Sequence, residues 1–438
     1  MSFKRVNGIG AVERAVAKAF VLRDALYLFW LGNPAQPRPV GEISLVLGGR
    51  AVGLRYGAQW LQEGFPLSQD LPLMDQLFIP RERDCAAGAL DDARPDRWGE
   101  RVIRKFEVAP RLSILEYLLF AGDDRYGALG VSQNALAYQP WSRGPAPAFA
   151  QLEQMAEVVR MVLNNESVPE RQRALVRPGA SLGGARPKSL IEMDGRQWLV
   201  KFPEDDEMDT PLVEHASMLL AAECGINAAP TRSLKLASGH AVAVQRFDRQ
   251  GDRRVHAVSA HVALRAAGEE YGYPELAQLL RRVAPAEQIA SLQEQLFRRM
   301  VFNILIDNTD DHEKNHALLR QDDGRYVLAP AFDVLPTAQG LGFQLMKVGE
   351  RGNESSLENA MSSCAQFGLR PAAARQLIAD LCAVVALWKK RFAAAGVSKR
   401  DIEYLARFVD RDWLREQREH FNRGKSPSRL ATPKKRPT

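Results

Sequence analysis

The segment 303–319, NILIDNTDDHEKNHALL, places a row of acidic, basic and amide side chains between two apolar runs. A helical pattern comes before this row, and a strand-like run, YVLAP at 326–330, comes after it. One further acidic residue, Asp333, stands just beyond that run in LAPAFDVLP. An acid-rich loop is usually a solvated turn, but the helix, the strand and the isolated Asp333 together favour a functional loop between buried elements.

The chain changes from strand patterns to helix patterns along its length. A Gly-Gly turn joins two strand-like runs in EISLVLGGRAVGLRY at 42–56, which predicts a hairpin. The segment PLVEHASMLLAAECGI at 211–226 has Pro near its start and Gly225 where a helix should stop. The other expected strands lie at 189–193, 197–202 and 232–247, and helix patterns lie at 112–122, at 149–165 and over most of the chain after residue 260.

This order predicts an α+β protein with two lobes, a β-rich N-terminal lobe and a helical C-terminal lobe. We divide the chain into a β-rich N-terminal part (1–140), a β/α part with a Gly-rich loop (141–258), a helical lobe (259–422) and a disordered basic tail (423–438). The length of 438 residues is compatible with two or three domains.

The net charge of +6 belongs to the tail, RGKSPSRLATPKKRPT, which holds six basic residues and no acid. Without it the chain has equal numbers of basic and acidic residues, so contact with nucleic acid is expected only through the tail or indirectly. No apolar run reaches the roughly 20 residues of a membrane span, and the N-terminus has no signal-peptide pattern. The four cysteines are far apart and predict buried free thiols. We expect a cytoplasmic protein.

A β-rich lobe followed by a helical lobe is the order used by protein kinases, which bind ATP and Mg²⁺ between the lobes. Asp310 and Asn315 have the D-x-x-x-x-N spacing of a kinase catalytic loop, where Asp orients the substrate hydroxyl and Asn binds a metal. Asp333 stands where a second Mg²⁺-binding carboxylate should come, and carboxylate and amide oxygens suit that ion. Lys201 ends the strand-like run WLVKF, and Glu214 in the next helix is a candidate partner for it.

Two further segments fit a nucleotide between the lobes. The loop Ser181-Leu182-Gly183-Gly184-Ala185 could bring backbone N–H groups close to phosphates, although adjacent glycines more often only make a turn. The segment AVAVQRFDR at 241–249 lies where a kinase chain crosses between lobes. Backbone groups from Gln245 to Phe247 are placed to pair with an adenine edge.

The sequence resembles the HipA family, the serine/threonine kinase toxins of bacterial toxin–antitoxin systems. The likeness spans roughly residues 30–395. It is carried by GASLGGARPKSLI, LVKFP, VQRFDR, NTDDHEKNHALL and LAPAFDVLP, and in the N-terminal part by GEISLVLGGRAVGLRY, LPLMDQLF and PDRWGERVI.

The resemblance implies a role for each matching position. Asp310, rather than its neighbour Asp311, becomes the catalytic Asp. Asn315 and Asp333 become Mg²⁺ ligands, and Lys201 contacts the ATP phosphates. The remaining nucleotide-binding positions are Ser181, Gly183, Gly184, Ala185, Gln245, Phe247 and the loop histidine His312.

The family also implies partners and a switch. Family members phosphorylate a serine of their own Gly-rich loop, here Ser181, and the added charge of about −2 expels the loop from the site. Known substrates include aminoacyl-tRNA synthetases, and a small DNA-binding, HipB-like antitoxin usually holds the toxin. This sequence departs from the family at Gln245, where a carboxylate often stands, and at Arg186 and Pro187 in the loop.

Three functions stay open on the sequence alone. The first is an ATP/Mg²⁺-dependent protein serine/threonine kinase, and the second is a non-catalytic nucleotide-binding co-repressor with a degenerate kinase fold. The presence of every catalytic residue type argues against the second. The third, a metal-dependent phosphoesterase built on Asp310, His312 and Asp333, has only one well-placed histidine.

Overall fold

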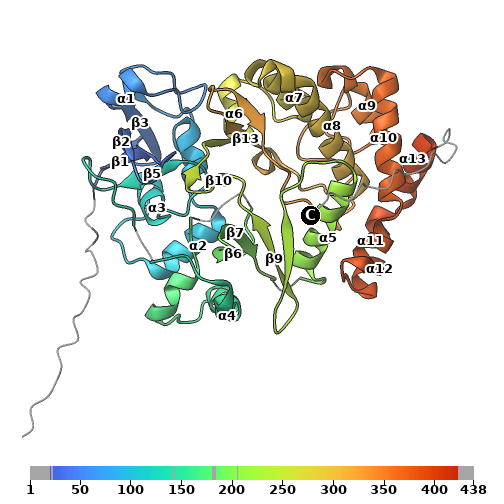
Figure 1. Cartoon of the computed structure of the whole chain (residues 1–438), viewed down its shortest axis with the longest axis horizontal. Coiled ribbons are helices and arrows are strands. Elements are labelled where there is room, and N and C mark those ends of the chain that lie inside the picture. The colour runs from blue at the N-terminus through green and yellow to red at the C-terminus, as the bar shows by residue number, and fades with distance from the viewer. Residues whose placement is uncertain (1–19, 21–22, 142–143, 180–183, 205, 423–438) are drawn as a thin grey trace, which may run out of the picture.

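The computed structural model describes residues 20, 23–141, 144–179, 184–204 and 206–422, and Figure 1 shows their arrangement. The predicted α+β class and the two-lobed order are confirmed: β1 to β12 all lie before residue 260, and helices dominate the chain after it. Ser181 and Gly183 of the Gly-rich loop, and the basic tail, lie outside the described residues.

The N-terminal part is an antiparallel five-stranded sheet in the order β4-β3-β2-β1-β5. The predicted hairpin at 42–56 is β2 and β3, and Gly48 and Gly49 at its turn have φ of +70° and +82°, which favour glycine. Alternate side chains such as Leu28, Ile43 and Leu54 are fully buried against α3. The elements are β1 (Ala25–Trp30), β2 (Arg38–Val46), β3 (Ala51–Tyr56), α1 (Ala58–Glu63), β4 (Leu77–Phe78), α2 (Arg97–Phe106), α3 (Ile114–Phe120) and β5 (Leu129–Ser132).

The second sheet has the order β6-β7-β9-β8 and is covered on both faces. Leu199 and Val242 face α5, whereas their neighbours Val200 and Ala243 face α4. This alternation is the period-two pattern of a strand that is buried on both sides. The elements are α4 (Leu152–Leu163), β6 (Lys188–Met193), β7 (Arg196–Lys201), α5 (Thr210–Glu223), β8 (Thr231–Lys235) and β9 (His240–Gln245).

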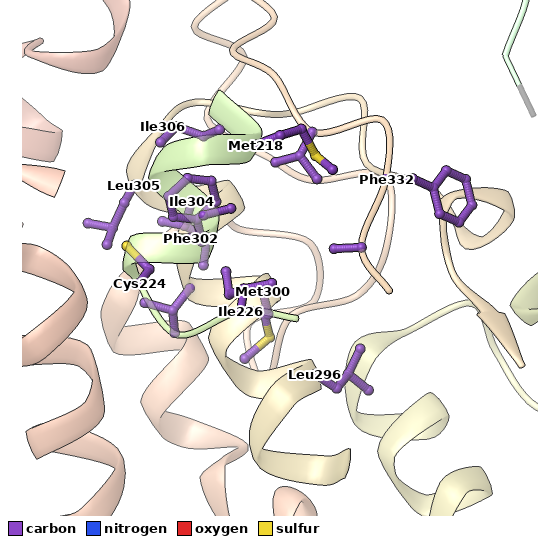
Figure 2. Packing of buried hydrophobic residues seen from close by; sticks show 14 of the residues in the cluster. Met218, Cys224, Ile226, Leu296, Met300, Phe302, Ile304, Leu305, Ile306 and Phe332 are labelled. Atoms are coloured by element: carbon purple, nitrogen blue, oxygen red, sulfur yellow. The ribbon is translucent and has the colours of Figure 1, made fainter. Parts of the chain in front are cut away.

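The C-terminal lobe packs its helices around α8, whose buried residues cover most of its circumference. Figure 2 shows Met300, Ile304 and other α8 side chains gathered with residues of the α5 region, such as Met218. A short sheet, β12-β13-β14, lies at its edge beside the ribbon β10-β11. The strands are β10 (Arg249–Gln250), β11 (Arg253–Arg254), β12 (Ala257–Ser259), β13 (Ala317–Arg320) and β14 (Tyr326–Leu328), and the helices are α6 (Ala260–Ala267), α7 (Tyr273–Val283), α8 (Ile289–Leu305), α9 (Leu357–Ser362), α10 (Pro371–Val385), α11 (Trp388–Ala394), α12 (Lys399–Val409) and α13 (Asp412–Asn422).

Two other expectations meet the structure here. All four cysteines are buried and none of them forms a disulfide, as predicted. Among the described residues no single helix has the length and hydropathy to cross a bilayer, although α10 and α11 meet those criteria when taken together across their 48° bend.

Candidate active site

A buried lysine joins the two lobes at the end of β7. The Lys201 Nζ donates to Glu214 Oε1 on α5 at 2.7 Å and to Asp333 Oδ1 at 2.5 Å. Burial alone would lower the pKa of Lys201, but the carboxylates of Asp333 and Glu214 outweigh it and raise this pKa. The same lysine holds the pKa of Asp333 below its usual value against the effect of burial. The predicted Lys201–Glu214 pair therefore forms, with Lys201 charged.

The loop after α8 treats its two neighbouring aspartates differently. Asp311 is buried and accepts hydrogen bonds from the Tyr273 hydroxyl and from His316 Nε2, the latter at 2.7 Å. Asp310 is exposed at the cavities described below, and its partial burial raises its pKa. Asp311 thus anchors the loop, whereas Asp310 is the acid available to a reactant.

Loop shape depends on one strained residue. Asp307 has a φ of +57°, a conformation that is costly for a residue with a Cβ. It is buried, forms an ion pair with Arg411 at 3.0 Å and accepts from Gly340 N–H at 3.1 Å. These contacts hold the start of the loop in place, so Asp310 is carried by a rigid support.

One cavity of about 220 Å³ collects the distant residues that the sequence singled out. Lys201, Asp310, Asn315 and Asp333 all line it, together with Gly184 and Ala185. A second cavity, of about 630 Å³, shares Gly184, Ala185 and Asp310 with the first and is also lined by His312, Lys314 and Phe332. Asp310 therefore stands where the two cavities meet. We call the two cavities together the cleft.

The oxygen atoms of the smaller cavity fit a divalent cation. Asn315 is buried, and none of the described residues forms a hydrogen bond with its Oδ1. Asp333 accepts from Lys201 with Oδ1, lines the same cavity and has a φ of +58°. In the described part of the chain no three His, Cys, Asp or Glu residues are placed to hold a metal alone. Mg²⁺ does not require such a cage, because it commonly takes one or two protein oxygens and completes its shell with phosphates and water.

A second buried lysine, Lys188, was not singled out from the sequence. It lies directly opposite Lys201 in the β6–β7 pairing. Its Nζ contacts Asp96 Oδ2 at the start of α2 and donates to the Gly184 carbonyl at 3.0 Å. Gly184 has a φ of +84°, and a Cβ built there would lie 3.5 Å from both Asp333 Oδ2 and Lys188 Nζ. Two opposed lysines are unfavourable without counter-charges, and here the carboxylates of Asp96, Glu214 and Asp333 supply them.

Some backbone groups of the segment between the lobes are already hydrogen-bonded to neighbouring segments. The N–H groups of Gln245 and Arg246 donate to the carbonyls of Pro230 and Gln197 at 2.9 and 3.1 Å. Adenine pairing here would have to use other backbone atoms, such as those of Phe247. The Phe247 ring lies 5.5 Å from Phe332 and 6.0 Å from Tyr126, and both of these line the larger cavity. Neither Gln245 nor Phe247 lines the two cavities itself.

The larger cavity also has a wall from the N-terminal part that sequence reasoning missed. Asp92 accepts hydrogen bonds from Ser259 N–H and Oγ, both at 2.7 Å. Burial raises the pKa of Asp92 to about 6 despite these bonds. His312 also lines this cavity, and its buried Nδ1 has no hydrogen-bond partner in the part of the chain that the structure describes.

The two lobes, the lysine between them and the Asp310–Asn315 loop define a protein-kinase-like fold of the HipA type. The HipA-like C-terminal domain matches residues 180–388, and the HipA N-terminal domain matches residues 35–132. The chain belongs to the HipA family.

Individual relatives are similar over parts of the chain. "Putative kinase Y4mE" of Sinorhizobium fredii is 27% identical over 65% of this chain and 72% of its own length. "Putative kinase Y4dM" of the same organism is 28% identical over 40% of this chain, which spans only half of that relative's length. HipA in a complex with HipB and operator DNA from Shewanella oneidensis MR-1 superposes with a TM-score of 0.62 at 18% identity, covering 90% of this chain and 97% of that one.

Proposed function

We propose that this protein is an ATP/Mg²⁺-dependent serine/threonine protein kinase that acts as the toxin of a bacterial toxin–antitoxin pair. In this proposal Asp310 accepts the hydrogen bond of the attacking hydroxyl and orients it toward the γ-phosphate. Lys201 binds phosphate oxygens, and Asn315 and Asp333 would hold Mg²⁺. The bound ion would neutralise charge between the β- and γ-phosphates.

One observation carries the proposal: Lys201, Asp310, Asn315 and Asp333, distant along the chain, line one cavity of about 220 Å³. The most specific part of this observation is the buried Oδ1 of Asn315, which has no hydrogen-bond partner among the described residues. A buried amide oxygen without a donor costs free energy unless a ligand uses it. An oxygen of this kind beside Asp333 supports binding of a metal with its nucleotide, and phosphate transfer is what separates a kinase from a non-catalytic nucleotide-binding fold.

The proposal extends to regulation and partners. Ser181 would be the site of self-phosphorylation, and a phosphoryl group there would be repelled by the phosphates of ATP. A protein substrate, such as an aminoacyl-tRNA synthetase, would take the phosphoryl group in the cytoplasm. A HipB-like antitoxin would bind both this protein and DNA. The similar HipA of Shewanella oneidensis, which was solved with HipB and operator DNA, supports this part of the proposal.

The test is transfer of labelled phosphate from ATP to the protein itself and to proteins of a cell lysate. Asp310→Asn keeps the size of the side chain but removes the carboxylate, and it should lower the rate by at least about 100-fold. Asp75→Asn, at an exposed aspartate that does not line the cleft, is the matched control and should transfer normally. Mass spectrometry then locates the label, which we expect at Ser181.

Two outcomes would contradict the proposal. Wild-type protein that binds ATP but transfers no phosphate to itself or to any lysate protein would favour a nucleotide-binding co-repressor. Equal transfer by wild type and Asp310→Asn would show that another group does the chemistry. Circular dichroism of each variant excludes loss of the fold as the cause.

A further inference from the structure

A third cavity, of about 320 Å³, lies away from the residues just described and shares no lining residue with the cleft. Four arginines line it: Arg38, Arg253, Arg254 and Arg320. They come from β2, β11 and β13, so the cavity lies where the N-terminal sheet meets the C-terminal lobe. Figure 1 shows β10, the partner of β11, between the N-terminal sheet and β13. We call it the arginine cavity.

Backbone bonds fix the segments that form the arginine cavity. Arg254 N–H donates to the Gly32 carbonyl at 3.1 Å, and Arg320 N–H donates to the His256 carbonyl at 2.9 Å. Trp30 and Arg38 are opposite each other in the β1–β2 pairing. A ligand would therefore meet a preformed site and lose little free energy to ordering it.

The charges of the arginine cavity are not balanced. Arg254 pairs with Asp123 at 2.7 Å, and Arg253 pairs with Asp322 at 3.1 Å. Neither Arg38 nor Arg320 has an ion pair with a carboxylate in the described part of the chain. Two positive charges thus remain, which matches the charge of about −1.5 to −2 on a phosphate monoester at pH 7.

Aromatic rings hold these two guanidinium groups. Arg320 lies over the Phe65 ring at 3.7 Å, and Arg38 lies over the Trp60 ring at 5.0 Å. The two rings are themselves in contact, with centroids 5.1 Å apart. A guanidinium stacked by its face keeps the N–H groups of its edge available, and that edge binds phosphate through two parallel hydrogen bonds.

The rest of the lining suits an organic group with polar hydrogens. His256 is buried and donates from Nε2 to the Leu67 carbonyl at 2.7 Å, and no described residue bonds its Nδ1. Burial lowers the pKa of His256 to about 4, so this nitrogen is an acceptor at neutral pH. Trp30 and the amide side chains of Asn33, Gln36, Gln250 and Gln321 complete the walls. The cavity is larger than a phosphate ion needs and lies at the lower end of the range for small-molecule sites.

We propose that the arginine cavity binds a small phosphorylated molecule, with Arg38 and Arg320 on the phosphate and the walls around Trp30 on an organic part that bears hydroxyl or amino groups. This site is additional to the proposed kinase centre and does not depend on it. Strand β13 starts two residues after Asn315 and ends at Arg320. A ligand bound to Arg320 would therefore be separated from the Asp310–Asn315 loop by the length of this one strand.

Calorimetric titration of the full chain at low salt tests the proposal, with ribose 5-phosphate and inorganic phosphate as separate probes. We expect ribose 5-phosphate to bind more tightly than inorganic phosphate. The variant Arg38→Gln/Arg320→Gln should bind ribose 5-phosphate at least about tenfold more weakly, since hydrogen bonds to charged groups are lost. The matched control is Arg232→Gln/Arg407→Gln, which removes two arginines stacked on Trp198 and Tyr404 outside the cavity.

The outcomes separate cleanly. Equal weakening in both double variants would reflect general charge and would overturn the proposal, as would wild type that binds neither probe. Preference for inorganic phosphate would contradict the organic part. Binding of a short single-stranded oligonucleotide that depends on Arg38 and Arg320, without binding of ribose 5-phosphate, would replace the proposal with a nucleic-acid contact. If the double variant fails to fold, Arg38→Gln alone must still weaken binding.

Discussion

The cleft and the arginine cavity both gather charged side chains from distant segments, but they balance their charges differently. In the cleft, buried Lys201 has two carboxylate partners and Lys188 has Asp96. In the arginine cavity, Arg38 and Arg320 rest on aromatic rings instead of carboxylates. In the cleft, the lysines therefore have their counter-charges before a reactant arrives. In the arginine cavity, the excess positive charge would be balanced only when an anionic ligand binds.

The largest effect should follow from breaking the paired centre. Asp333→Asn removes the carboxylate that Lys201 binds at 2.5 Å and a proposed metal ligand. We expect phosphate transfer to fall by about 1000-fold or more, because a preorganised charge at such a centre is worth roughly 100- to 1000-fold and the metal is weakened as well. Initial rates across a range of Mg²⁺ concentrations measure this. A loss that excess Mg²⁺ cannot reduce would assign Asp333 to Lys201 alone.

The next effect separates the two neighbouring aspartates. Asp311→Asn should lower the free energy of unfolding by about 2–4 kcal/mol, because the buried carboxylate is bonded to Tyr273 and His316. Asp310→Asn should change it by no more than about 0.5 kcal/mol, since Asp310 is exposed. Urea unfolding of both variants is the measurement. Equal destabilisation would mean that Asp310 also supports the loop and is not free for a reactant.

These contrasts show what the sequence could predict. The hairpin at 42–56, the strand pair with Lys201 and the helix with Glu214 follow from local patterns, because period, turn glycines and caps are encoded within a few residues. The spacing of Asp310 and Asn315 is local for the same reason. The burial of Asp311, which leaves Asp310 exposed beside it, is only partly local: His316 is five residues from Asp311, but Tyr273 is 38 residues before it.

Contacts between the N-terminal part and the rest were beyond pattern reasoning. Asp96 meets Lys188 across 92 residues, and Asp92 meets Ser259 across 167. The arginine cavity takes its residues from strands whose alternation predicts burial but not which edges will meet. The helix pattern after residue 371 did not predict the 48° bend between α10 and α11, because no Pro or Gly stands at the break between them.

A smaller effect tests Asp92, the N-terminal wall of the cleft. Its pKa of about 6 in the folded protein exceeds the ordinary 3.8, so the folded protein binds more protons between these values. The contribution of Asp92 to stability is therefore complete below pH 4 and is lost as the pH rises through 6. The Asn side chain in Asp92→Asn does not titrate, so the variant does not lose this stability as the pH rises. Relative to wild type, its free energy of unfolding should rise by about 1–2 kcal/mol between pH 4 and pH 7.

Urea unfolding of both proteins at several pH values gives that difference directly. Asp123→Asn is the contrasting control, because Arg254 outweighs burial and lowers the pKa of Asp123. Its difference from wild type should fall as the pH rises, mostly below about pH 5, and stay nearly constant above that. If the difference between Asp92→Asn and wild type did not depend on pH, the pKa of Asp92 would not be raised. The hydrogen bonds from Ser259 would then offset the whole effect of burial on this pKa.

The smallest effect concerns the rim of the arginine cavity. Arg253 and Asp322 form an ion pair at 3.1 Å with most of both side chains exposed, so Arg253→Gln should change the free energy of unfolding by no more than about 0.5 kcal/mol. Because its charge is already balanced by Asp322, its loss should weaken binding of ribose 5-phosphate by less than about threefold at 0.15 M salt, where screening over 8 Å reduces the pull of a rim charge. Titration of Arg253→Gln beside Arg38→Gln measures the ranking. If the rim variant loses as much affinity as Arg38→Gln, the whole basic surface attracts the anion, and the contrast between paired and unpaired arginines fails.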